Sequence, residues 1–176
     1  VQKVAVTDEV IEKVLVFIAG RTHNILLDEG YRYDVVEAIE AFHAKNPGLA
    51  KPMVKILNGW VEKPIWADVL PAFSRCVRMT RDLKDVFIVD ESVLVEDEEK
   101  ALYATVLKAE ASLAGSFDLE MALEQISLLV TPINGFFDKV LVMAEEQALR
   151  ESRLGILQRI AGLMKPYADL SKLEGF

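Results

Sequence analysis

Arginine is the residue type whose spacing in this sequence points most directly to a chemistry. Arg75, Arg78 and Arg81 follow one another at intervals of three residues, which on a helix places them in a slowly rotating stripe along one side. Such a stripe can follow a phosphate backbone, and guanidinium groups also stack on unpaired bases. The stripe therefore predicts a contact surface for RNA, although surface arginines more commonly solubilise a protein or pair with acids.

A second basic segment runs from Arg150 to Lys172, where five basic residues stand against two acids. The first segment, from Arg75 to Lys84, has four basic residues against one acid, within a chain of formal net charge −8. Nonspecific attraction to phosphate needs an excess of Lys and Arg, so this balance excludes a protein that coats DNA and favours local contact with an anion. Arg150 also has Glu146 four residues earlier, which suits an ordinary helix ion pair.

Aromatic residues near the basic segments supply the other groups that an RNA site needs. Unpaired bases stack on aromatic side chains, which makes them sequence-tolerant partners for single-stranded RNA. The same residues at helical spacing are more often part of a core. Six aromatic residues are candidates: Tyr31, Tyr33, Trp60, Trp66, Phe136 and Phe137.

Signatures of catalysis do not accompany these basic and aromatic groups. The sequence has no Gly-rich phosphate loop, no Gly-x-Ser-x-Gly, no Cys-x-x-Cys and no His-Glu-x-x-His. His23 and His43 lie on different expected helices without neighbouring metal-type ligands, and Cys76 is expected to be a small buried hydrophobe. We therefore expect no catalytic centre and no metal site in this chain.

Composition bounds the class of protein. With 176 residues, of which 52% are apolar and 27% charged, the chain can bury the core of one compact domain. The apolar stretch near the start, Val14 to Gly20, is far shorter than the roughly 20 residues of a membrane span. A single cysteine fits a reducing cytoplasm. Because the first residue is Val1 and a helical pattern begins almost at once, we expect a piece of a longer chain.

The elements that must position the basic groups are helices. Between residues 82 and 97 the helical period is lost, and we expect an extended connector there. Asn46, Pro47 and Gly48 predict a turn, and Pro132 must bend or divide a long helix. The pattern thus predicts an all-α protein, a helical bundle. The expected helices span about 7–30, 34–46, 49–62, 65–80, 98–114, 118–141 and 145–167.

Apolar side chains of the first helix are expected to lie on the core. They recur broadly at i, i+3 and i+4, the spacing of a helix with one buried face. The side chains concerned are Val10, Ile11, Val14, Leu15, Phe17, Ile18, Ile25 and Leu26.

Several segments resemble the β subunit of bacterial-type glycyl-tRNA synthetases. The resemblance spans nearly the whole chain, and the order of its segments is more specific than any one of them. Ala148-Leu149-Arg150 is similar to the motif for which DALR-type anticodon-binding domains are named, with Gln147 in place of the motif's Asp. The matching segments are 29–38, 89–94, 99–103, 132–143 and 145–157.

The resemblance implies a DALR-type helical domain from the C-terminal part of that subunit. Residues 1–84 would form the N-terminal helical part of the anticodon-binding region and residues 85–176 the DALR-like bundle, and the two parts would make one compact unit. Its function would be recognition of the tRNA anticodon in the cytoplasm. Glycine and ATP, with magnesium, would be activated by a separate α subunit or a fused α region, so this chain would hold no cofactor, and neither a membrane nor DNA is expected as a partner.

The residues assigned to this function come from both basic segments. The arginines would hold the anticodon stem-loop, Tyr33 would stack on a base, and a carboxylate would read cytosine by accepting from its exocyclic amine, because glycine anticodons carry cytosine at their second and third positions. Asp34 and Asp138 are the candidates for that carboxylate. The full set of expected tRNA-binding residues is Arg75, Arg78, Arg81, Arg150, Arg153, Tyr33, Asp34 and Asp138.

Two other interpretations of the sequence stay open at this point. The domain could mainly dock other parts of the synthetase and contact tRNA little, which the net charge of −8 favours. It could also be the anticodon domain of an arginyl-type enzyme, against which the Phe136-Phe137-Asp138 context counts. An enzyme in its own right is the least expected, because no nucleophile, base and oxyanion donor can be nominated together.

Overall fold

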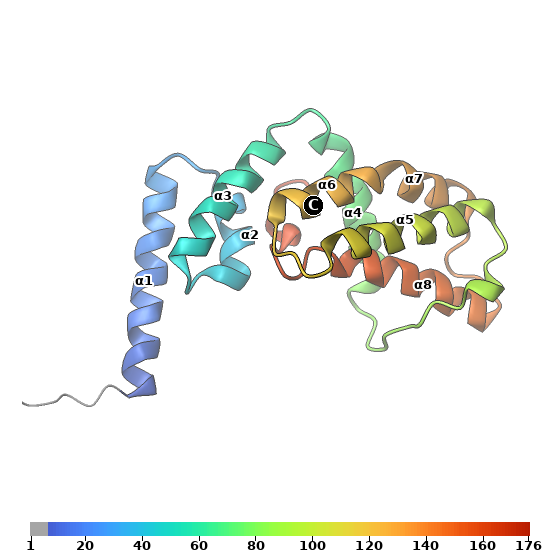
Figure 1. Ribbon diagram of the computed structural model, residues 1–176, viewed down its shortest axis with the longest axis horizontal. Helices are drawn as coiled ribbons and strands as arrows, with labels where there is room; N and C mark the ends of the chain where they lie inside the picture. The colour runs from blue at the N-terminus through green and yellow to red at the C-terminus, as the bar shows by residue number, and fades with distance from the viewer. Residues whose placement is uncertain (1–6) are drawn as a thin grey trace, which may run out of the picture.

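The computed structural model describes residues 7–176, and all regular structure in that range is helical. The elements are α1 (Asp8–Asp28), α2 (Tyr33–His43), α3 (Pro47–Val61), α4 (Trp66–Thr80), η1 (Glu91–Val93), α5 (Asp97–Leu113), α6 (Leu119–Leu128), α7 (Val130–Lys139), α8 (Gln147–Gly162) and η2 (Leu170–Lys172). Figure 1 shows an elongated molecule with α1 at one end, α2 and α3 next to it, and the helices α4 to α8 bundled at the other end. The expected all-α bundle is confirmed.

Local sequence signals explain where several helices begin. The side chain of Thr7 accepts a hydrogen bond from the backbone N–H of Val10 at the start of α1, and Asp118 caps α6 in the same way. Asn46 caps α3, whose first residue is Pro47, so the turn expected there is the start of a helix instead. The long helix expected over 118–141 divides at Leu129, three residues before Pro132.

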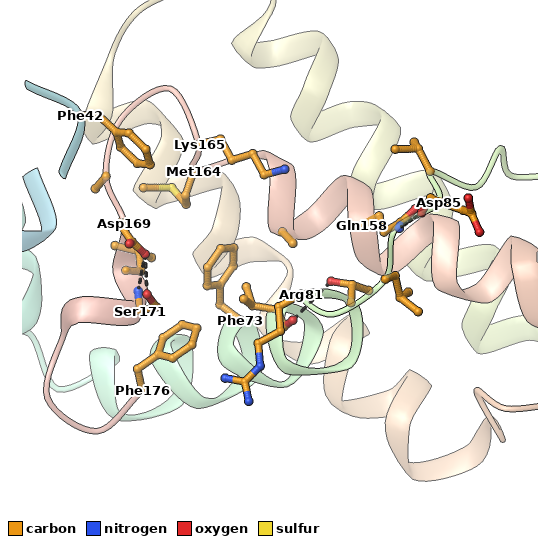
Figure 2. Close-up of a pocket in the computed structure, with 17 residues that line it drawn as sticks. Phe42, Phe73, Arg81, Asp85, Gln158, Met164, Lys165, Asp169, Ser171 and Phe176 are labelled. Atoms are coloured by element: carbon orange, nitrogen blue, oxygen red, sulfur yellow. Dashed lines mark hydrogen bonds between the residues drawn. The ribbon is translucent and has the colours of Figure 1, made fainter.

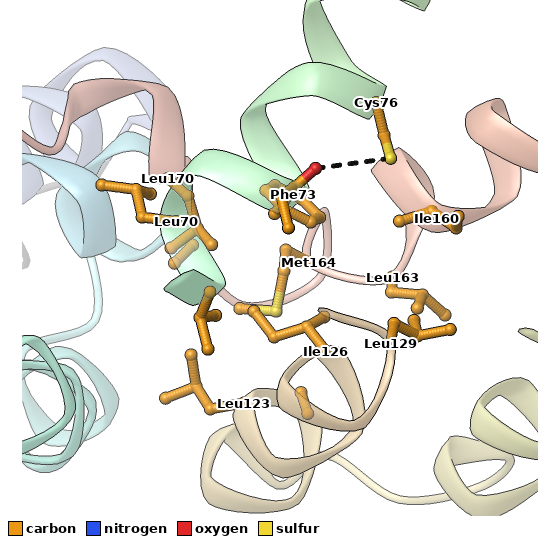
Figure 3. Packing of buried hydrophobic residues seen from close by; sticks show 14 of the residues in the cluster. Leu70, Phe73, Cys76, Leu123, Ile126, Leu129, Ile160, Leu163, Met164 and Leu170 are labelled. Atoms are coloured by element: carbon orange, nitrogen blue, oxygen red, sulfur yellow. Dashed lines mark hydrogen bonds between the residues drawn. The ribbon is translucent and has the colours of Figure 1, made fainter. Parts of the chain in front are cut away.

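The core lies where α4, α6 and α8 meet. Side chains from these helices and from η2 interdigitate there (Figure 3), among them Phe73 of α4, Ile126 of α6 and Ile160 of α8, all buried. α4 packs more extensively on α8 than any other pair of helices packs together. Because α4 precedes residue 84, a boundary at that point would cut through one continuous core.

The end of the chain returns to α2. The backbone N–H of Asp169 donates to the carbonyl of Ala38 over 2.8 Å, and that of Glu174 donates to Oδ2 of Asp34 over 2.8 Å. These bonds join the first helices of the chain to its last residues. Backbone hydrogen bonds therefore hold the end of the chain against α2.

The connector between α4 and α5 lies across α8. Gln158 accepts from the N–H of Phe87 over 2.9 Å and donates to the carbonyl of Asp85 over 2.8 Å, and Ser152 accepts from the N–H of Asp90. The backbone of Phe87 approaches Gly155 so closely that a Cβ there would lie 2.9 Å from its carbonyl oxygen. A glycine is thus required on α8 where the connector crosses.

The apolar face of α1 does not lie on the core, contrary to expectation. Leu26 is the only buried residue of this helix, while Val14 is 50% exposed and Phe17 is 69% exposed. The side of α1 that is less exposed carries the half-buried Leu15 and Ile18, and one polar pair joins His23 of α1 to Glu40 of α2. No helix within residues 7–176 is long and apolar enough to cross a membrane.

We predict that Gly155→Ala destabilises the fold by about 1–3 kcal/mol, because the added methyl group meets backbone that cannot move without displacing the connector. Urea unfolding followed by circular dichroism measures the change. Gly162→Ala, on the same helix with nothing within 4 Å of its added Cβ, is the matched control and should be neutral or slightly stabilising. Equal stability of the two variants would contradict the close approach.

Candidate nucleic-acid interface

The three arginines of α4 form the basic stripe that their spacing predicts. Arg75, Arg78 and Arg81 are all exposed, whereas Phe73 and Cys76 on the other side of the same helix are buried. α4 therefore presents one apolar side to the core and one cationic side to solvent. We call Arg75, Arg78 and Arg81 the α4 stripe.

Aromatic rings hold two of these guanidinium groups. The guanidinium carbon of Arg75 lies 4.1 Å from the ring centre of Phe137 on α7, and that of Arg78 lies 5.7 Å from the ring centre of Phe176. A cation over a ring face is attracted by the ring quadrupole, which orients the side chain without neutralising it. Arg81 instead forms a long ion pair, with its Nε 3.6 Å from the carboxylate of Asp82.

The end of α7 carries two exposed charged residues after Phe137. Asp138 follows Phe137 directly and is exposed at the end of that helix. Its neighbour Lys139 pairs with Glu98, and Glu98 keeps its pKa below the usual value chiefly because Lys139 donates to it. Asp138, a candidate base reader, is thus an exposed carboxylate on the same helix as Phe137, whose ring lies against Arg75.

Asp34 is a structural residue and not a surface carboxylate, which corrects its assignment. Its side chain is fully buried and accepts from Arg32 over 3.0 and 2.6 Å and from the N–H of Glu174. Burial alone would raise the pKa of Asp34, but these hydrogen bonds outweigh it and the pKa is lowered. Tyr33 beside it is 59% exposed and stays available for stacking.

Arg153 is likewise structural, so its assignment as a tRNA contact is also corrected. It is 4% exposed, its Nε donates to Oε2 of Glu99 over 2.6 Å, and a terminal nitrogen donates to the carbonyl of Leu141 over 2.8 Å. Glu99 is fully buried and also accepts from the N–H groups of Val95 and Glu96. Both carboxylate oxygens of Glu99 and two nitrogens of Arg153 are therefore hydrogen-bonded inside the protein.

Arg150 turns towards backbone as well. It is half-buried and donates to the carbonyl oxygens of Ala144 over 2.8 Å and of Glu145 over 3.4 Å, instead of forming the helix pair expected with Glu146. Two arginines of α8 thus fasten the segment that leads into this helix. The expected site residues that stay at the surface are Arg75, Arg78, Arg81, Tyr33 and Asp138.

Most of the aromatic candidates belong to the core. Trp66 and Phe136 are buried, and Trp60 is buried with its indole N–H donating to Glu120 over 2.8 Å. Phe137 is half-buried under Arg75 and remains a surface candidate. Burial also raises the pKa of the Cys76 thiol to about 12, which keeps it protonated at neutral pH.

Sequence reasoning missed a cavity beside the stripe. A space of about 480 Å³ opens between α4, the end of α8 and η2, with Arg81 and Phe176 among its lining residues (Figure 2). Its wall also includes Phe42 and Asp169, which come from distant parts of the chain. No local sequence pattern predicts that these segments lie together, although Arg81 and Lys165 belong to the two basic segments found in the sequence.

Comparisons with known proteins show which family and which relatives this chain is similar to. Residues 69–171 match the family described as DALR anticodon binding domain. The chain is 32% identical to the chloroplastic/mitochondrial glycine–tRNA ligase 2 of Arabidopsis thaliana over 179 residues, which cover all of this chain and 17% of that protein. It is also 32% identical to the glycine–tRNA ligase β subunit of Moorella thermoacetica over 94% of this chain and 24% of that subunit, and to that of Acinetobacter baylyi over 96% and 25%. The chain thus spans a quarter or less of the length of these relatives.

We predict that Glu99→Gln lowers the free energy of unfolding at pH 7 by about 3–5 kcal/mol, because it leaves Arg153 buried without a counter-charge. Glu98→Gln removes the neighbouring, more exposed pair with Lys139 and should lower it by less than about 1 kcal/mol. Urea titrations compare the two variants. Similar losses in both would contradict a special role for the buried pair.

The same pair predicts a pH dependence. Burial raises the pKa of Glu99, but the bonds from Arg153, Glu96 and Val95 outweigh it, so the folded-state pKa lies below the usual value. Its stabilisation is fully present above about pH 4.3, the unfolded pKa, and is lost as the pH falls through the folded pKa. Urea midpoints of the wild type should therefore fall more steeply with acid than those of Glu99→Gln.

Proposed function

The chain belongs to the DALR anticodon-binding domain family, and on that premise we propose that it recognises the anticodon of glycine tRNA as part of a glycyl-tRNA synthetase β subunit. The observation that carries this proposal is the α4 stripe, which lies within the matched residues 69–171. The similarity to glycine–tRNA ligases over nearly the whole chain supports the choice of tRNA.

The stripe would bind the phosphates of the anticodon loop. Phosphate contacts fix position and register, whereas base contacts specify sequence. Phe137 and Phe176 hold the guanidinium groups of Arg75 and Arg78 over their faces, so these cations lose little freedom when a phosphate binds. Tyr33 and Asp138 supply an exposed ring and an exposed carboxylate for bases.

The whole enzyme would need further parts. In this proposal a separate α subunit or fused α region activates glycine with ATP and magnesium, and the complex works in the cytoplasm. This chain contributes tRNA recognition to that partner. The similarity to proteins named as β subunits supports the division of labour.

One observation favours a second role, docking within the synthetase. The exposed apolar side chains of α1, among them Phe17, suit protein contact better than RNA contact, and the net charge of −8 opposes broad RNA binding. The exposed apolar side chains lie on α1 and the arginine stripe on α4, two helices that lie apart in Figure 1, so both roles are compatible with the same chain. Nothing favours an arginyl-type domain, because the relatives compared are glycine–tRNA ligases.

We predict that Arg75→Ala and Arg78→Ala each weaken binding of a hairpin RNA with the glycine anticodon about fivefold to tenfold. Each should also reduce the slope of log affinity against log salt by about 1, because one phosphate contact is lost. Fluorescence anisotropy across a salt series measures both quantities. Lys108→Ala removes an exposed cation of α5 and is the charge-matched control; an equal effect there would contradict the assigned surface.

A further inference from the structure

The connector between α4 and α5 turns two large apolar side chains to solvent. Val86 is 87% exposed and Ile88 is 88% exposed, more than any other large apolar side chain within residues 7–176. Phe87 and Val89, which alternate with them, are half-buried and pack against the core. Alternation with a period of two is the pattern of an extended strand with one covered face. Residues 86–90 contain no helix or turn, so the connector presents a short strand whose outer face is apolar.

α8 covers only one edge of this strand. The N–H of Phe87 and the carbonyl of Asp85 both bond the side chain of Gln158. In an extended chain the backbone groups of successive residues point to opposite edges, so those of Val86 and Ile88 point away from Gln158. Neither Val86 nor Ile88 makes a backbone hydrogen bond within residues 7–176. The strand therefore has a free edge, which is a template for pairing with another chain.

The sequence along this edge is complementary to itself. If two copies pair in antiparallel fashion about Phe87, Val86 of each copy stands opposite Ile88 of the other. Because the free backbone groups belong to Val86 and Ile88, these are the opposed residues that exchange both N–H to carbonyl bonds. The same register sets Lys84 of each copy opposite Asp90 of the other, and both side chains are exposed. Each apolar side chain thus gains an apolar neighbour, and each charge gains an opposite one.

The middle of the strand carries none of the devices that block pairing. Natural edge strands are protected by proline, by charged side chains or by a covering element. Residues 86–89 read Val-Phe-Ile-Val, without proline, glycine or charge, and all four residue types favour strands. Figure 1 shows the connector at the outside of the bundle, where a second molecule can reach it. The charges that flank this apolar stretch pair across the two copies instead of repelling.

We propose that two copies of this chain associate through the connector, residues 84–90 of each forming a two-stranded antiparallel sheet centred on Phe87. Four backbone hydrogen bonds join the copies, two for each pairing of Val86 with Ile88. Two short strands bury little surface, so the dimer is weak, with a dissociation constant on the order of 100 μM. The contact uses none of the residues assigned to tRNA, and the inference is independent of the proposed function.

Sedimentation velocity of the whole 176-residue chain tests this association. The wild type should pass from monomer to dimer between about 10 μM and about 1 mM. Ile88→Lys should raise the dissociation constant at least about tenfold, because a lysine replaces the apolar partner of Val86 in both pairings. Phe17→Lys makes a similar change at a 69% exposed side chain of α1 and should leave the constant unchanged. Circular dichroism checks that both variants keep their helices.

A charge reversal tests the ends of the pairing. Lys84→Glu places an acid opposite Asp90 and should raise the dissociation constant about threefold to tenfold at low salt. Lys108→Glu makes the same change of net charge on α5, away from the connector, and is the matched control. An equal effect of the two variants would show that net charge alone governs association, which overturns the register.

Disulfide trapping tests the register directly. Directly opposed residues that exchange both hydrogen bonds have Cα atoms about 5.5 Å apart, within reach of a disulfide, whereas diagonal neighbours are about 7–8 Å apart. With oxidised glutathione as the oxidant, a mixture of Val86→Cys and Ile88→Cys should therefore cross-link at least about tenfold faster than either variant alone. The native Cys76 does not compete, because it is buried and its pKa is raised to about 12.

Three outcomes would overturn the proposal. The first is a wild type that stays monomeric up to about 1 mM. The second is a dimer that Ile88→Lys leaves intact and Phe17→Lys abolishes, since α1 would then be the interface. The third is a dimer in which the mixed cysteine variants cross-link no faster than each one alone. None of these results changes the expected binding of the hairpin RNA, so the proposed function is judged separately.

Discussion

The ion pair between Arg153 and Glu99 is the interaction on which the arrangement of the bundle depends. Two charges withdrawn from water stabilise a fold only if hydrogen bonds replace their hydration, and here backbone groups at both ends of the pair do so. Glu99 also closes the capping box of α5 with Glu96, so one carboxylate starts a helix and anchors another. The ion pair fixes α8 against α5, and α4, the helix with the arginine stripe, packs on α8.

This role changes how the family motif is understood. Arg150 and Arg153 lie in the segment that resembles the DALR signature, yet both side chains make hydrogen bonds within the protein, Arg150 to a backbone carbonyl and Arg153 to Glu99. Gly155 in the same segment makes room for the connector. In this chain the segment thus holds the helical bundle together and does not present its arginines to solvent. In our proposal, discrimination among tRNAs comes from α4 and the surfaces around it.

The sequence alone predicted the helices well, because caps, prolines and apolar spacing are local signals. It predicted the α4 stripe for the same reason, since three arginines on one helix share a side wherever that helix lies. It failed for Arg153 and Asp34, whose burial depends on Glu99 and on the end of the chain. Because these partners are distant in the sequence, the sequence does not show that either charged residue is paired and buried. The prediction that both are exposed was therefore wrong. The cavity was missed for a similar reason, because its walls come from separate segments.

The nearly uncovered helix α1 has a consequence for how the molecule opens. Its 21 residues bury only Leu26 and include many β-branched side chains, which have modest helix propensity. Little apolar contact therefore opposes local unfolding of α1, whereas α4 and α8 can open only when the core does. Amide hydrogens should accordingly exchange with solvent in two tiers, rapidly along α1 and orders of magnitude more slowly in α4 and α8. Although α1 packs on the rest of the molecule, it should thus unfold independently of the core that α4 and α8 share.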